Sequence, residues 1–110
     1  MLQRTLAKSV SVTGVGLHSG ERVALTLHPA EENSGISFRR TDLSGEMGEV
    51  IQLNPYLIND TRLSSTIVTD KGVRIGTIEH IMSALSAYGI DNALIELNAP
   101  EIPIMDGSSL

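Results

Sequence analysis

The adjacent pair Glu79 and His80 has the residue types in this sequence best suited to chemistry. It follows Thr77, a favoured N-cap residue, where an extended run gives way to a helical pattern. Both side chains are then predicted to lie in the first helical turn, where free backbone N–H groups and the helix dipole stabilise a carboxylate and favour a neutral imidazole. A carboxylate base beside a neutral imidazole, which can bind a metal, suits metal-assisted hydrolysis. The alternative is a helix start that is stabilised by charge alone.

The rest of the chain offers no obvious partners for a metal at His80. Catalytic zinc sites generally use three protein ligands. The chain has no cysteine, and its other histidines are His18 and His28. No histidine stands four residues from His80, so the H-E-x-x-H motif is absent. The sequence therefore predicts one candidate metal ligand rather than a whole site.

Other polar segments are weaker candidates for chemistry. Residues 14–20 have the spacing G-x-G-x-x-x-G, which matches no phosphate-binding loop and favours a hairpin turn, with His18 at its tip either catalytic or simply exposed. His28, before Pro29, is interpreted as structural or solvated. Residues 60–66 are rich in hydroxyls but lack a base partner, so a serine-hydrolase triad is unsupported.

Composition narrows the class of protein. The length of 110 residues fits one domain, and the net charge of −5, with no basic cluster larger than Arg39-Arg40, argues against nucleic-acid binding. The absence of cysteine agrees with a reducing compartment, and no apolar run approaches the roughly 20 residues of a membrane span. We expect a soluble, cytoplasmic protein.

The periodicity predicts an α+β fold, a mainly antiparallel sheet backed by a helix on one face. One clear helix is expected from Thr77 to Tyr88, ended by Gly89. Its core stripe is predicted to contain Ile78, Ile81, Met82, Leu85 and Tyr88. A second stripe of His80, Ala84 and Ala87 would let another helix approach closely. The predicted strands are residues 7–13, 21–28, 35–40, 50–53, 63–69, 73–75 and 91–98.

The C-terminal region suggests an incomplete domain. Pro100 and Pro103 predict a rigid edge connection, or a wall that places Asp106 near Glu79. Residues 106–109 are typical of a turn and N-cap that open a helix, yet the sequence stops at Leu110. A sheet of about six strands with one helix would leave an apolar face uncovered. We therefore expect a fragment, or a partner that covers that face.

Three blocks together resemble a known family. They read TGVGLHSG at residues 13–20, IGTIEH at 75–80 and NAPEIPIMDGS at 98–108. In this order and spacing they resemble the N-terminal domain of the UDP-3-O-acyl-N-acetylglucosamine deacetylases, the zinc amidases of lipid A biosynthesis. The segments LTLHPA at 25–30 and FRRTDL at 38–43 fit the same family, so the resemblance covers essentially the whole chain.

The resemblance implies a fold and a role for particular residues. It implies two related domains packed helix to helix around the active site, with residues 1–110 forming the first domain, truncated near its second helix. Glu79 matches the general base, and His80 matches the one zinc ligand from this domain. The resemblance also implies candidate residues for the lining of the active site: His18, Arg62, Leu63, Ser64 and Asp106. The substrate implied is a UDP-linked acylated amino sugar, which loses acetate.

The same resemblance implies what this chain lacks. The family's other zinc ligands, a His and an Asp in an H-K-x-x-D motif, belong to the second domain, so the fragment is expected to be inactive alone. The family often has cysteine where Ser64 stands. We also expect the fragment to self-associate through exposed apolar surface. The alternative function is a non-enzymatic binding module, although such a module would have no chemical use for the pair Glu79 and His80. A third possibility is a homodimer that shares a metal through two His80 side chains, but that site would still be short of ligands.

Overall fold

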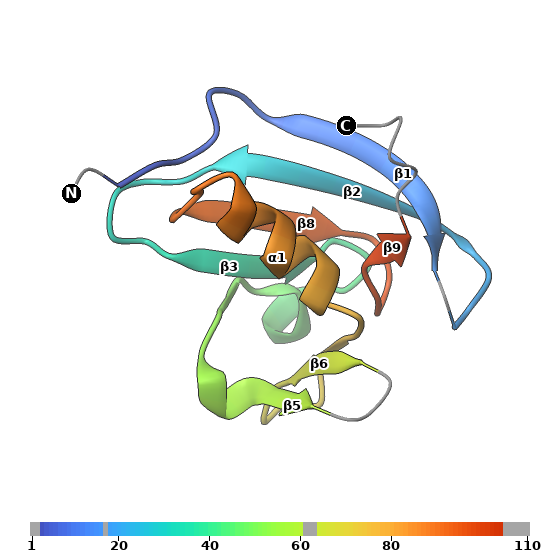
Figure 1. The fold of residues 1–110 in the computed structure, drawn as a ribbon. Coiled ribbons are helices and arrows are strands. Elements are labelled where there is room, and N and C mark those ends of the chain that lie inside the picture. The colour runs from blue at the N-terminus through green and yellow to red at the C-terminus, as the bar shows by residue number, and fades with distance from the viewer. Residues whose placement is uncertain (1–2, 17, 61–63, 105–110) are drawn as a thin grey trace.

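A computed structural model describes residues 3–16, 18–60 and 64–104 of the chain. A six-stranded sheet, with strand order β4-β3-β8-β2-β1-β9, forms the larger layer (Figure 1). Its strands are β1 (Val10–Gly16), β2 (Arg22–Pro29), β3 (Ile36–Arg40), β4 (Ile51–Gln52), β8 (Ala93–Leu97) and β9 (Pro103–Ile104). All neighbours pair antiparallel except β3 and β8, which are parallel. The predicted α+β class is confirmed.

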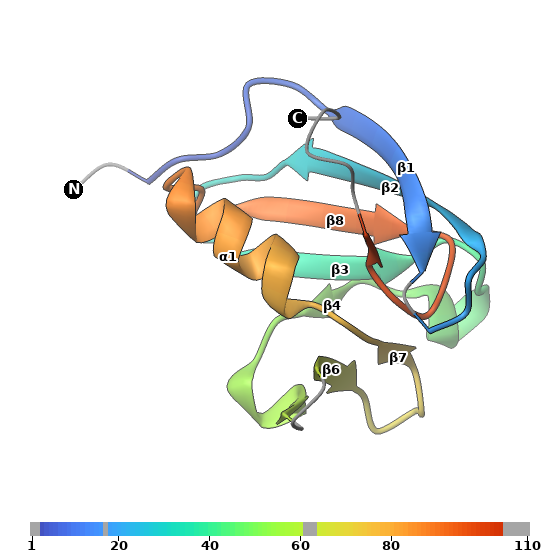
Figure 2. The same cartoon turned by 45° about the vertical axis from the view of Figure 1, so that its right-hand side comes forward.

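A second, three-stranded sheet has the order β5-β6-β7. It consists of β5 (Ile58–Asp60), β6 (Ser65–Val68) and β7 (Arg74–Ile75), and the 3-10 helices η1 (Gly45–Gly48) and η2 (Pro55–Leu57) precede it in the chain. The α-helix α1 (Glu79–Ala87) lies across one face of the large sheet, with the small sheet beyond the start of the helix (Figure 2). Ile67 and Ile75 of the small sheet are fully buried in the same core as the large sheet.

The two faces of the large sheet differ in polarity because side chains alternate along each strand. On the inner face, Leu27, Ile95 and Phe38 stand opposite one another on β2, β8 and β3, and Ile95 and Phe38 are completely buried. On the outer face, a polar row crosses four strands in register: Ser11, Thr26, Glu96 and Arg39. The outer face is therefore compatible with water and needs no cover.

The start of α1 differs from the expectation. The helix begins at Glu79 with Ile78 as its N-cap, and no side chain caps it. Thr77 has a φ of 60° and its buried hydroxyl has no hydrogen-bond partner among the described residues, so the prediction of Thr77 as the N-cap was wrong. An N-cap residue needs extended backbone to aim its side chain at the helix, and Thr77 lies in the left-handed region instead.

The end of α1 confirms the role of Gly89. Gly89, at φ 69°, donates its N–H to the Ser86 carbonyl, and Ile90 donates to Leu85 in a Schellman motif. Tyr88 was predicted to lie in the core stripe but is 68% exposed. The chain turns away after Ala87, and Ile90 packs against the core instead.

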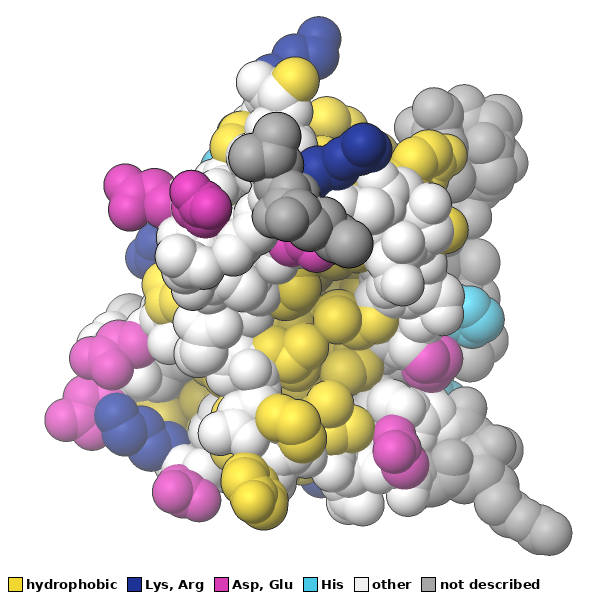
Figure 3. Space-filling model, turned by 60° about the vertical axis from the view of Figure 1, so that its left-hand side comes forward, with side chains coloured by type: hydrophobic (Ala, Val, Ile, Leu, Met, Phe, Trp, Pro, Cys, Tyr) yellow, Lys and Arg dark blue, Asp and Glu magenta, His cyan; other side chains and the backbone are white. Residues whose placement is uncertain are grey.

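The structure contains two strands that were not predicted, β5 and β9, and it has two sheets where one was expected. β5 is only three residues long, and β9 contains Pro103. Pro103 has no N–H to donate, but β9 is the outermost strand and pairs only with β1, where a proline is tolerated. Ile67 and Ile75 of the small sheet are buried in the same core as the large sheet. The small sheet therefore covers apolar surface that a single sheet would have exposed. A hollow of hydrophobic side chains remains on one side of the molecule (Figure 3).

Candidate active site

Glu79 and His80 lie next to each other at the start of α1, as predicted from the sequence. The Glu79 side chain is half-buried, and its Oε2 accepts a hydrogen bond from the Ser65 N–H at 3.3 Å. The N–H of Ile78 donates to the Ser65 carbonyl at 3.1 Å, so both backbone groups of Ser65 hold the helix start. His80 is exposed. The site therefore combines a fixed carboxylate with an accessible imidazole.

A second carboxylate, Glu101, is buried beside the turn that follows β1. It is 5% exposed, and its carboxylate oxygens accept hydrogen bonds from the N–H groups of His18, at 3.2 and 3.3 Å, and of Ser19, at 2.9 Å. Burial raises the pKa of Glu101, but the hydrogen bonds from Ser19 and His18 and the nearby His18 imidazole outweigh it and lower the pKa below its usual value. Glu101 therefore stays ionised inside the protein.

The backbone around Glu101 also holds the segment that leads into α1. The N–H of Gly76 donates to the Pro100 carbonyl at 2.7 Å, and the N–H of Ile102 donates to the Gly76 carbonyl at 2.9 Å. These bonds form a parallel bridge between Gly76 and Glu101. The start of the helix is thus fixed from two sides, by Ser65 of β6 and by the residues on either side of Glu101.

These segments surround a cavity of about 420 Å³. The residues of interest that line it are His18, Ser19, Ser64, Thr66, Thr77 and Glu101. Two of the predicted site residues, His18 and Ser64, therefore share one cavity, although 46 positions separate them in the sequence. Glu79 and His80 do not line this cavity, but Thr77, two residues before Glu79, does. Arg62, Leu63 and Asp106 lie outside the described residues.

Sequence reasoning missed Glu101. One signal was present, because Glu101 is the only charged residue in the otherwise apolar stretch from Ala99 to Met105. A second signal was the glycine at position 16; in the structure a Cβ atom there would lie far inside van der Waals distance of the Glu101 carboxylate. Neither signal identifies its partner from sequence alone.

The residues that the structure describes do not form a complete metal site. No three His, Asp or Glu side chains come together among the residues that the structure describes. An exposed imidazole such as His80 can offer one ligand, but a catalytic zinc site generally needs three. The described residues therefore do not hold zinc by themselves.

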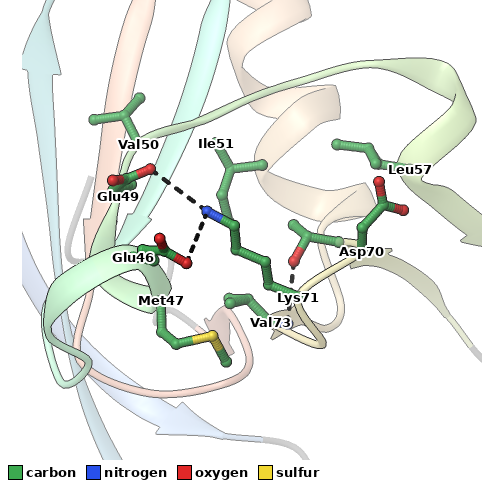
Figure 4. Close-up of a pocket in the computed structure, with 10 residues that line it drawn as sticks. Glu46, Met47, Glu49, Val50, Ile51, Leu57, Asp70, Lys71 and Val73 are labelled. Atoms are coloured by element: carbon green, nitrogen blue, oxygen red, sulfur yellow. Dashed lines mark hydrogen bonds and ion pairs between the residues drawn. The ribbon is translucent and has the colours of Figure 1, made fainter.

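A second, smaller cavity of about 250 Å³ lies between η1 and the turn after β6 (Figure 4). Lys71 reaches across it and pairs with Glu46 at 3.7 Å and Glu49 at 3.8 Å. Ile51, Leu57 and Val73 supply apolar walls. None of the predicted site residues lines this cavity, and Lys71 is ion-paired with both glutamates, so we interpret the cavity as a contact between η1 and the turn after β6.

His28 is structural, in agreement with the sequence interpretation. Its Nδ1 is hydrogen-bonded to the Ser9 hydroxyl at 2.9 Å, and its Nε2 contacts a Glu96 carboxylate oxygen. Arg39 pairs with the other oxygen of Glu96. The hairpin expected at residues 14–20 is also confirmed, with Gly20 at φ 70° and its N–H bonded to the Gly16 carbonyl.

The structure thus shows an α+β domain with a held carboxylate and an exposed imidazole at the start of its helix. Residues 3–110 match the family of UDP-3-O-acyl N-acetylglycosamine deacetylases, and the chain belongs to that family. Among the described residues, no helix is long and apolar enough to cross a membrane.

Named relatives agree with this family. The chain is 94% identical over all 110 residues to the UDP-3-O-acyl-N-acetylglucosamine deacetylase of Neisseria meningitidis serogroup C / serotype 2a, and 93% identical to that of Neisseria gonorrhoeae. It is 62% identical over 109 residues to the enzyme of the same name from Chromobacterium violaceum. The chain spans 36% of the length of the two Neisseria relatives and 35% of the Chromobacterium relative.

Proposed function

We propose that this chain is the first domain of a zinc-dependent deacetylase that removes acetate from a UDP-3-O-(3-hydroxyacyl)-N-acetylglucosamine in lipid A biosynthesis. In this proposal Glu79 is the general base and His80 is one zinc ligand. The remaining ligands come from a second domain outside this chain. The proposal is supported by family membership and by one observation above all, the pairing of a held carboxylate with an exposed imidazole at the start of α1.

The geometry of Glu79 suits a general base. The Ser65 N–H fixes Oε2, which leaves Oε1 as the candidate acceptor for the proton of an attacking water. A positioned carboxylate of this kind typically contributes about 10²- to 10⁴-fold to a rate. His80 adds no proton chemistry in this proposal; its exposure leaves the imidazole free to meet a metal that the second domain shares.

The test uses a chimera in which this chain replaces the matching segment of the Neisseria meningitidis relative. The unchanged chimera is expected to release acetate from the UDP-linked substrate and to leave a free amine on the sugar, which remains attached to UDP. Glu79→Gln is expected to lower kcat by about 10²- to 10⁴-fold with little change in KM, because the amide cannot accept the proton. Glu21→Gln, the same change at an exposed turn, is the matched control.

Two outcomes would contradict the proposal. An unchanged chimera that folds but has no deacetylase activity would favour the non-enzymatic binding module. A Glu79→Gln variant that keeps the full kcat would remove the general base from the proposal while leaving the family assignment intact.

A further inference from the structure

Glu101 contacts two segments that the proposed function needs. Its side chain holds the backbone of His18 and Ser19, and its own backbone is bridged to Gly76, three residues before Glu79. A single residue therefore connects the turn after β1 to the start of α1. No other carboxylate among the described residues accepts hydrogen bonds from two consecutive backbone N–H groups.

The surroundings of Glu101 are built to admit its carboxylate. Gly16 lies directly against it, and any side chain at that position would collide with Oε1. The turn then closes over the carboxylate, with the Gly20 N–H bonded to the Gly16 carbonyl at 2.9 Å. A buried charge is costly unless it is hydrogen-bonded, so the matched donors are what allow Glu101 to be 5% exposed.

The backbone that Glu101 helps to hold is strained. Thr77, the residue after Gly76, has a φ of 60°, which is rare for a β-branched residue, and its buried hydroxyl lacks a partner among the described residues. Such a conformation persists only where neighbouring contacts hold it in place. The two hydrogen bonds between Gly76 and the segment Pro100 to Ile102 supply those contacts.

We propose that Glu101 is a positioning residue, which fixes the turn that contains His18 and the segment from Gly76 to Thr77, both beside the same cavity, and so fixes the segment that leads into α1 at Glu79. The inference rests on the proposed function, since positioning matters only if Glu79 and His80 act in catalysis. Glu101 itself need not touch substrate. Its effect passes through the backbone of His18 and Ser19 on one side and of Gly76 and Thr77 on the other.

The experiment measures positioning and activity in the same protein, the chimera described above. Hydrogen exchange by mass spectrometry is compared for peptides covering residues 16–20, 76–82 and, as an internal control, 91–97 of the buried strand β8. Glu101→Gln is expected to speed exchange in the first two peptides and not in the third. Its kcat, expressed per folded molecule, is expected to fall on the order of 10- to 100-fold with KM nearly unchanged.

Matched variants separate positioning from a general loss of structure. Glu21 has an exposed side chain in the same hairpin, so Glu21→Gln is expected to change neither hydrogen exchange nor kcat. Glu101→Asp keeps the charge on a shorter side chain, so it is expected to show the same pattern in a milder form, and it replaces Glu101→Gln if that variant does not fold. Gly16→Ala should displace the carboxylate, and combining it with Glu101→Gln should not lower kcat beyond the worse single variant.

Three results would overturn the inference. Unchanged exchange at residues 16–20 or 76–82 would show that Glu101 does not hold both segments. Faster exchange in all three peptides would make its role merely structural. Faster local exchange with kcat within about twofold would show that the positioning has no catalytic effect. If the unchanged chimera is inactive, the proposed function fails, and the exchange measurement alone decides whether Glu101 holds both segments.

Discussion

At the scale of single residues, two glutamates of this chain have opposite relations to their surroundings. Glu79 is half-buried and accepts one backbone hydrogen bond, which suits a group that must exchange a proton. Glu101 is buried and accepts hydrogen bonds from two consecutive backbone N–H groups, which suits a group that stays charged and does not move. Their burial and bonding, rather than their residue type, support the different roles that we propose for them.

The lowered pKa of Glu101 predicts a specific dependence of stability on pH. The pKa of the Glu101 carboxyl is lower in the folded state than its usual value of 4.5. Such a group stabilises the fold at pH values above its usual pKa, and this stabilisation is lost as the pH falls through the lowered pKa. Glu101→Gln should therefore reduce the free energy of unfolding by about 1–3 kcal/mol at neutral pH. The difference from the unchanged chain should shrink as the medium becomes more acidic.

Urea unfolding followed by circular dichroism at a series of pH values measures this effect. Glu21→Gln, which removes an exposed carboxylate of the same hairpin, should follow the unchanged chain at every pH. A difference between Glu101→Gln and the unchanged chain that stayed constant down to strongly acidic pH would contradict the assignment of a lowered pKa.

At the scale of elements, α1 is short, and its ends are held by different means. Its 9 residues are too few for a stable isolated helix, so packing and end contacts must maintain it. Ile81 and Leu85 are buried in the core, the start is bonded to Ser65, and the end is closed by Gly89. The helix that carries Glu79 and His80 is therefore a product of the tertiary structure.

Gly89→Ala tests the closure of this helix. Gly89 has a φ of 69°, and an added Cβ would meet only ordinary contacts with Arg4, so the expected cost is conformational, about 1–2 kcal/mol. Ser83→Ala, at an exposed position within the helix, should change the free energy of unfolding by no more than about 0.5 kcal/mol and in the stabilising direction. Equal effects of the two substitutions in urea unfolding would contradict the role given to Gly89.

At the scale of the whole molecule, polar and apolar surfaces are divided unequally. The outer face of the large sheet carries the polar row that includes Thr26 and Glu96, whereas hydrophobic side chains gather in a hollow on one side of the molecule (Figure 3). The outward-facing stripe of α1 also has small side chains, such as the exposed Ala87. This distribution leaves apolar surface that contact with another molecule would remove from water.

We predict that the 110-residue chain by itself self-associates as its concentration rises, because contact between molecules removes the hydrophobic hollow from water. Sedimentation velocity over a concentration series measures this. The chimera that supplies a second domain is the control, and it should remain a single species over the same range. A monodisperse monomer of the isolated chain at every concentration would contradict the prediction.

The sequence by itself determined the features that depend on local pattern. Alternation with a period of two located most strands, helical spacing located α1, and Gly89 marked its end. The adjacency of Glu79 and His80 was likewise visible, because the two residues are consecutive in the sequence. These features depend on neighbours within a few residues.

Only the tertiary structure decided which distant segments meet. The contact of Glu101 with His18 spans 83 positions, and it exists because the edge strand β9 pairs with β1 and Gly76 bridges to Glu101. The left-handed backbone at Thr77 depends on the same kind of long-range pairing, through the bridge between Gly76 and Glu101. Local propensity does not determine such pairings, because their stability comes from packing and hydrogen bonds between segments that are far apart in the chain.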